Sequence, residues 1–399
     1  MANTLTPTDV YTIVNEVALQ ATGREDLKAV DTSSFVAVGE TLLRLGTENT
    51  LNALSTVLSR TIFSSRPYNA RLRSLVVDSE RWGAMIRKIV YFPTEAQEST
   101  DWNSDINPNT LVDGNSVDMY KINKKKAMQL NFYGTKLLQK CITRFKTQLD
   151  LAFQSESEFG QFMNAMMIEF QNDIETMYES ESRATLLNYI GGISAMGLYE
   201  VDLAKEYNDK YGTSYSRDQL LTTHVESFMK FVASTIKIYS NRMEDRSALY
   251  HANLTNYPNI LRHTPKARQR MIMYSPLFIE AEANVYSSLF NPQYLDIGTY
   301  EGVNFWQSQT DPTAVRVTPN ILDVATGESK TADNTIELPY VLGLLHDEEA
   351  LGINFQFDYA STTPFNSAGG YYNTFYHWRR NYWNDFTKNA ILFVIGNGE

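Results

Sequence analysis

The longest regular element that the sequence predicts is the segment SESEFGQFMNAMMIEFQNDIETMYESESRATLLNY, residues 155–189. Its apolar side chains recur every three or four residues, which places them on one face of an α-helix. They are Phe159, Met163, Met166, Phe170, Ile174 and Met177. Ser155 and Glu158 have the spacing of a capping box, and Gly191–Gly192 is the expected stop. Such a helix is roughly 50 Å long, so we expect a spine with the methionine stripe in the core.

Two shorter helices are predicted ahead of this spine. The first runs from about Asp9 to Thr22, with Thr8 as its N-cap and Gly23 as its end. The second covers roughly Glu48 to Phe63, and a polar connection joins the two. Both helices are short and amphipathic. We therefore expect an N-terminal arm that packs on a neighbouring subunit.

A long polar segment, Pro93–Asp118, interrupts the strand-like segments that follow the arm, Arg71–Asp78, Ala84–Phe92 and Met119–Tyr133. It carries six carboxylates and no Lys or Arg, whereas the returning strand is basic. An isolated hairpin is only marginally stable in water, so we expect this flap to lie on another copy of the protein. The predicted intersubunit contacts are Asp101 and Asp105 in the acidic tip and Lys121, Lys124, Lys125 and Lys126 in the basic strand.

Helices and strands alternate in the second half of the chain. Ser216 and Gln219 form a capping box for a helix to about Arg242. A strand (Arg270–Ser275), a helix (Pro276–Leu289) and extended segments at 303–306, 336–345, 371–383 and 388–396 follow. Ala390–Ile395 is entirely apolar, which predicts a buried central strand. The pattern favours a mixed α+β fold.

Charge argues against a sequence-specific nucleic-acid reader, because the net charge is −11 and the pI is about 5.1. The best basic cluster is RHTPKARQR, with Arg262, Lys266, Arg268 and Arg270. It predicts either a DNA-facing surface or an interface between subunits. A solvated face or an intersubunit salt-bridge partner is favoured over specific DNA binding, because the cluster is short and lacks interleaved aromatic residues.

Motifs of catalysis and cofactor binding are absent from the sequence. There is no phosphate-binding glycine loop and no G-x-S-x-G elbow, and the five histidines lack metal-ligand spacing. Cys141 is the sole cysteine, which we interpret as structural, and Asp347–Glu349 is interpreted as a solvated turn or helix start. No signal or membrane-spanning segment is recognised. We therefore expect no enzyme, cofactor or metal, and synthesis in the cytoplasm.

The order of arm, flap, spine helix, α+β insertion and closing strands resembles the major capsid proteins of tailed bacteriophages, the Hong Kong 97 fold. The closing segment GGYYNTFYHWRRNYWNDFTKNAILFVIG, residues 369–396, is similar to the last strands of capsid proteins from small short-tailed phages (podoviruses) of Gram-positive bacteria. FVAVGETLLRLGTENTLNALSTVLSRTIF, residues 35–63, shares that similarity.

The resemblance implies an N-arm (1–65), an E-loop hairpin (66–135), a P-domain with the spine helix (136–216), an A-domain (217–345) and P-domain return strands (346–399). It also implies a virion shell protein that forms hexamers and pentamers around double-stranded DNA. Its expected partners are itself, a scaffolding protein, a portal and, non-specifically, the genome. The alternatives are an encapsulin-like shell protein and a carboxylate-based hydrolase.

Overall fold

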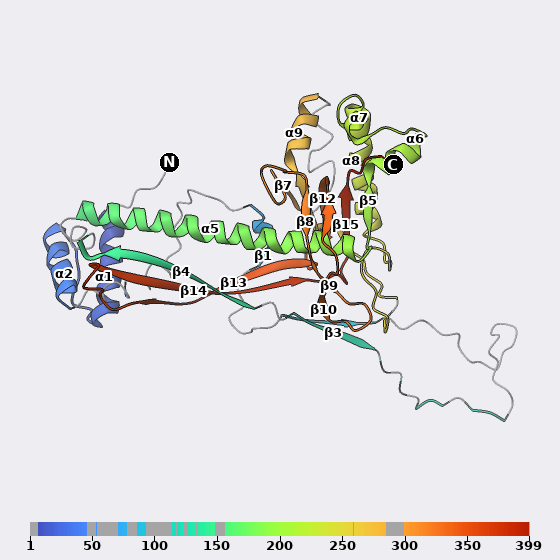
Figure 1. The fold of residues 1–399 in the computed structure, drawn as a ribbon. Coiled ribbons are helices and arrows are strands. Elements are labelled where there is room, and N and C mark those ends of the chain that lie inside the picture. The colour runs from blue at the N-terminus through green and yellow to red at the C-terminus, as the bar shows by residue number, and fades with distance from the viewer. Residues whose placement is uncertain are drawn as a thin grey trace.

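The computed structural model describes residues 7–45, 53, 71–77, 86–92, 114–116, 118–120, 122, 124, 126–132, 135–147, 156–257, 259–284 and 299–398. Helices and strands mix along the chain, as the α+β prediction requires. Figure 1 shows a rod-like helix with a helical arm at one end and a mixed lobe at the other.

The rod is α5, Glu156–Ala195, whose 40 residues make it about 60 Å long. The predicted spine is confirmed, and Phe159, Met166 and Phe170 of its stripe are buried. The predicted stop is wrong, because α5 continues through Gly191–Gly192. It ends at Ala195, and Gly197, two residues later, has a φ of +60° that suits a left-handed cap. Ser155 lies outside the described residues, so its capping box stays a prediction.

A four-stranded sheet in the order β1-β13-β14-β4 runs along the spine (Figure 1). β14 (Tyr371–Asn384) pairs antiparallel with β13 (Leu351–Thr362) and β4 (Lys136–Phe145). Alternate residues of β14 are buried, and Tyr376 and Trp378 pack with Phe170 of α5. Here the extended segment 371–383 is confirmed.

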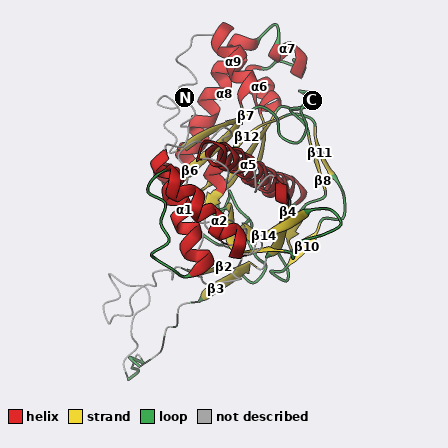
Figure 2. Cartoon of the chain, turned by 90° about the vertical axis from the view of Figure 1, so that its left-hand side faces the viewer, coloured by secondary structure: helices red, strands yellow, loops and turns green. Residues whose placement is uncertain are grey.

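The lobe contains the largest core, around a five-stranded sheet in the order β5-β15-β12-β6-β7. Its strands are β5 (Glu200–Asp202), β6 (Gln269–Tyr274), β7 (Thr299–Val303), β12 (Val341–Asp347) and β15 (Ala390–Val394). Every residue of β12 and β15 is buried, which confirms the predicted central strand. Helices α6 (Leu203–Tyr211), α7 (Arg217–Leu221), α8 (Val225–Arg242) and α9 (Ser275–Asn284) complete the lobe (Figure 2).

Short strands fill the connection from β7 to β12. β8 (Val315–Val317) pairs with β11 (Ile336–Leu338), and β9 (Asn320–Leu322) pairs with β10 (Ser329–Thr331).

The capping box of Ser216 and Gln219 is confirmed. The single helix predicted after it is wrong, because the chain forms α7 and α8 with a break between them. Thr222 and Thr223, both β-branched, occupy that break.

The arm consists of α1 (Pro7–Thr22) and α2 (Thr32–Leu45). α1 confirms the first predicted helix, but it begins at Pro7, so Thr8 lies inside it and is not its N-cap. α2 replaces part of the predicted polar connection. Phe35 is fully buried and contacts Phe159 of α5 with ring centroids 5.6 Å apart. The arm therefore packs on its own spine, and its packing on a neighbour stays a prediction. The second predicted helix, 48–63, lies outside the described residues apart from Ala53.

The region after the arm is less extended than predicted. Within Arg71–Asp78, a 3-10 turn (Arg73–Leu75) precedes a strand of only two residues, β1 (Val76–Val77). Leu72 adopts a left-handed backbone at φ 63°, which interrupts an extended conformation. The division of the chain into five named domains stays a prediction.

Candidate intersubunit surfaces

The root of the flap is a two-stranded sheet formed by β2 (Ile86–Tyr91) and β3 (Ala127–Phe132). The strands pair antiparallel from Ile86↔Phe132 to Tyr91↔Ala127, and β1, β4 and the lobe strands belong to other sheets. The predicted hairpin is confirmed here. The returning strand is shorter than expected, because the described residues between 118 and 126 have no strand pairing.

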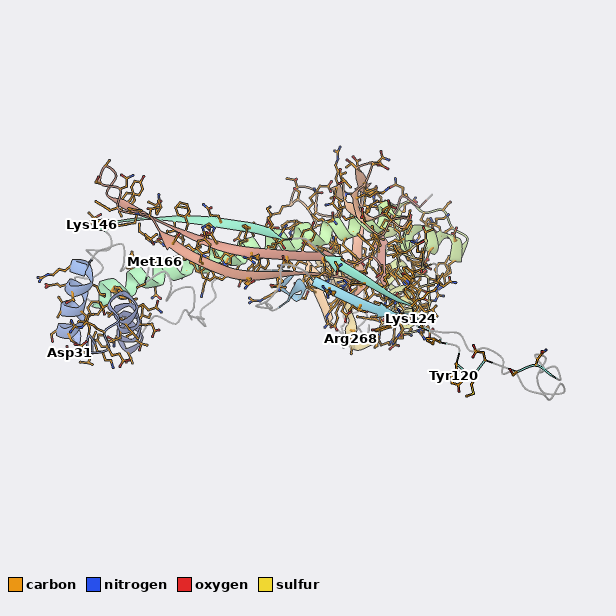
Figure 3. All side chains as sticks on the ribbon, turned by 90° about the horizontal axis from the view of Figure 1, so that it is seen from below. Asp31, Tyr120, Lys124, Lys146, Met166 and Arg268 are labelled. Atoms are coloured by element: carbon orange, nitrogen blue, oxygen red, sulfur yellow. The ribbon has the colours of Figure 1, made fainter. Side chains whose placement is uncertain are left out.

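Beyond its root, the flap leaves the body. Figure 3 shows Tyr120 well outside the lobe and Lys124 at the point where the chain departs from it. Met119, Tyr120 and Ile122 are 79%, 80% and 90% exposed. Apolar side chains exposed to this degree on a projecting segment are typical of a surface that a partner covers.

The residues predicted for the flap contact are only partly described. Lys124 and Lys126 are exposed. Asp101, Asp105, Lys121 and Lys125 lie outside the described residues. The pairing of the acidic and basic groups of the flap therefore stays a prediction.

The arginines of the predicted basic cluster contact acceptors of their own chain. Arg262 is half-buried, its Nε donates to the Thr387 carbonyl over 3.0 Å, and burial lowers its pKa. Arg268 lies 3.2 Å from Glu348, and Arg270 lies 2.7 Å from the same carboxylate. Lys266 is half-buried and begins a 3-10 turn, Lys266–Arg268. Whether these residues face DNA or a neighbouring subunit stays a prediction.

The Asp347–Glu349 cluster is more enclosed than the solvated turn that we predicted. Asp347 ends the buried strand β12 and accepts a hydrogen bond from Thr264 Oγ1 at 2.8 Å. Glu349 lies 2.5 Å from Lys388, and this lysine holds the pKa of the carboxyl below its usual range. The sequence analysis missed the pairing of this acidic run with Arg268 and Arg270.

We searched the described residues for cavities and for groups of metal ligands. Two cavities of about 530 and 550 Å³ lie beside the β9–β10 hairpin, and the second is lined mainly by amide, aromatic and apolar side chains. Within the described ranges, no group of three potential ligands could hold a metal ion. None of the described helices has the length and apolar character needed to cross a membrane.

One face of the long sheet is open to solvent in the described part of the chain. Leu137 and Phe145 of β4 are 66% and 46% exposed. Tyr359 of β13 is 51% exposed and stacks on His377 of β14 at 4.4 Å. Cys141, also exposed, lies on the same strand as Leu137. This second apolar surface is on the body, whereas the first is on the flap.

A spine helix, a long sheet along it, a mixed lobe and a projecting hairpin together form a fold that solved phage capsid structures also have. The capsid structure of Staphylococcus phage Andhra shares this fold, with 12% identity, a TM-score of 0.53, and coverage of 84% of this chain and 87% of that one. A structure of native bacteriophage P68, described by its head fibre and inner core protein, matches with 12% identity, a TM-score of 0.49, and coverage of 84% and 88%.

The model of the Phi29-like phage major capsid protein family matches residues 10–394, and the chain belongs to that family. A search of curated protein sequences found no match. The family makes the chain a structural protein of the virion capsid, as the sequence predicted. It favours neither the encapsulin-like alternative nor the hydrolase.

Proposed function

We propose that this major capsid protein assembles as hexamers and pentamers into an icosahedral shell around packaged double-stranded DNA. In this proposal the flap of each subunit lies over a neighbouring copy. The arm, flap, spine and lobe would then serve as the N-arm, E-loop, P-domain and A-domain of the Hong Kong 97 fold. Family membership supports the shell, and the exposed flap supports this mode of contact.

The observation that carries the flap contact is the exposure of Met119, Tyr120 and Ile122. Burying a large apolar side chain stabilises an assembly by about 1.5–3 kcal/mol. Figure 3 shows Tyr120 away from the body of its own chain. A neighbouring copy is the partner that a shell supplies at every position, and weak contacts repeated over many copies make a strong shell.

Charge then sets the register of this contact. The acidic tip with Asp101 and Asp105 and the basic strand with Lys121 and Lys124–Lys126 would meet their complements on neighbouring subunits. Exposed ion pairs contribute only about 0–1 kcal/mol each. We therefore assign alignment to the charges and most of the binding free energy to the apolar side chains.

The test is a variant with Lys124→Glu, Lys125→Glu and Lys126→Glu. We expect a folded subunit with an unchanged melting temperature, and hindered assembly, seen as few or no shells in negative-stain electron microscopy at the concentration at which the native protein assembles. The control replaces the exposed Lys28, Lys146 and Lys330 with Glu, which changes the net charge equally and should leave assembly intact. Normal shells from the flap variant would show that these lysines do not align the contact.

The remaining roles follow from the same proposal. Arg262, Lys266, Arg268 and Arg270 would face the DNA or a neighbouring subunit, and contact with the genome would be non-specific. A scaffolding protein and a portal would join the assembly, and synthesis would take place in the host cytoplasm. We also propose that the subunit has no enzymatic activity, which the family's structural role supports.

A further inference from the structure

The root of the flap carries a buried cation. The side chain of Lys88, on β2, is 16% exposed, and its Nζ lies 3.1 Å from a carboxylate oxygen of Asp385, which is 1% exposed. The same ammonium group donates to the main-chain carbonyl of Glu349. Burial lowers the pKa of Lys88. A buried charge costs free energy unless it is paired. The pair of Lys88 and Asp385 therefore favours the one arrangement of β2 and the end of β14 in which the two groups meet.

The two groups that accept from Lys88, the Asp385 carboxylate and the Glu349 carbonyl, belong to the body, and each has further hydrogen bonds there. Asp385 follows β14, and its other carboxylate oxygen accepts from the Thr387 hydroxyl at 2.7 Å and the Thr387 backbone N–H at 3.0 Å. The Glu349 carbonyl also accepts from Trp383 Nε1 at 3.1 Å. The carboxylate therefore sits between the end of β14 and the start of β15, where the two main sheets meet.

The other contacts of the flap root are apolar. Phe92 stacks on Tyr257 with centroids 4.6 Å apart, and Met128 packs with Leu254 and Ile260. The packing of Met128 is non-directional, and one aromatic stack contributes only about 0.5–1.5 kcal/mol, whereas an ion pair with a second hydrogen bond fixes both distance and angle. Among the described residues of β2 and β3, Lys88 is the one with a salt bridge to the body.

We propose that Lys88 is a positioning residue, which fixes the direction in which the flap leaves the body by its bonds to Asp385 and the Glu349 carbonyl. This inference rests on the proposed function, in which the flap meets a neighbour. β2 and β3 pair only with each other among the described strands, so no wider sheet sets their angle. Without the pair, the root could slide on its apolar contacts and present Met119, Tyr120 and Ile122 in many orientations.

The experiment measures the direction of the flap in unassembled subunits. Cys141, exposed on β4, and a Ser116→Cys substitution in the flap each receive a spin label. Electron–electron double resonance then gives the distribution of distances between them. We expect one narrow peak for the protein with native Lys88, loss of that peak in Lys88→Met, and its recovery in Lys88→Arg, which keeps the charge.

A second variant covers the case in which Lys88→Met fails to fold, because it leaves Asp385 buried without its partner. Lys88→Met with Asp385→Asn removes both charges, and we expect a folded subunit with a broad distribution. The matched control is Lys388→Met, which breaks the pair with Glu349 on the body and should keep the narrow peak. A narrow peak in the folded double variant, or a broad one with native Lys88, overturns the proposal.

Assembly is measured separately, by light scattering. If a Lys88 variant gives a broad distribution of spin-label distances and still forms normal shells, the positioning role is supported and the flap contact of the proposed function is contradicted. A narrow distribution with failed assembly contradicts the positioning role and leaves the flap contact standing. A broad distribution with failed assembly supports both.

Discussion

Buried polar side chains gather where the two main sheets meet, and two of them are histidines. His251 contacts the Ile260 carbonyl at 2.7 Å and Asn389 Oδ1 at 2.9 Å. Burial lowers its pKa. His346, on β12, is 1% exposed and contacts the Asp347 carbonyl at 2.8 Å. His346 needs only one N–H for its contact, so its buried ring is neutral in the folded state, and burial makes its protonation unfavourable there.

His346 makes the stability of the subunit depend on pH. Burial lowers its pKa to about 4, with Asp347 and Arg270 as its charged neighbours. Between pH 6.5 and 4 the unfolded chain binds a proton that the folded chain does not. The stability from this residue is therefore complete above pH 6.5 and falls by about 3 kcal/mol as the pH drops to 4.

Urea denaturation of the native chain and of His346→Gln at several pH values checks this. The difference in unfolding free energy between the two proteins should shrink as the pH falls through this range. His251 titrates in both proteins and so cancels from the comparison. Parallel curves for the two proteins would mean that His346 is protonated equally in both states.

In helix α5, tertiary contacts override a local sequence signal. A Cβ on Gly192 would lie 2.3 Å from the Phe386 ring, and one on Gly191 would lie 2.3 Å from Val317 Cγ1. These glycines allow close packing on the helix, and they are not its stop. A single sequence cannot distinguish the two roles, because both depend on partners more than a hundred residues away.

Gly192→Ala should therefore destabilise the lobe although alanine favours helix by about 1 kcal/mol. Overpacking costs typically about 1–3 kcal/mol, so we expect a net loss of up to about 2 kcal/mol in urea denaturation. Gly160→Ala, in the same helix, is the matched control. Its Cβ would lie 3.5 Å from Val10, an ordinary contact, so this substitution should stabilise the protein. A stabilising Gly192→Ala would contradict the packing role.

The other differences between sequence and structure have similar causes. The start of α2 was readable: Asp31 accepts from the Ser34 backbone N–H at 2.7 Å, and its own N–H donates to Ser34 Oγ at 2.9 Å. This reciprocal cap precedes the apolar residues Phe35, Val38 and Leu42. β4 was not predicted, because Lys136 and Lys140 share the inward face of this edge strand with Ile142, so its sequence lacks the alternation typical of a strand. Spine, hairpin and closing strand were predicted because their signals are long and local. The partners of Lys88 were not, since they lie some 260 to 300 residues later.

The whole subunit must assemble against its own charge. Each copy carries −11, so neighbouring copies repel one another over long distances, whereas the proposed flap pairs attract at contact. Salt separates the two effects, because it screens distant charges before close ones. The Debye length falls from about 30 Å at 0.01 M to about 8 Å at 0.15 M and about 3 Å at 1 M.

We therefore expect the critical concentration for shell assembly to fall as salt rises to about 0.15 M and to rise again towards about 1 M. Light scattering on a dilution series measures it. The variant with glutamate at positions 124–126 lacks the flap pairs, so its critical concentration should only fall with salt. This comparison also removes the effect of salt on apolar contacts, which is common to both proteins. If the native protein shows no rise at high salt, repulsion alone governs assembly, and the flap contact is held by its apolar side chains without help from charge.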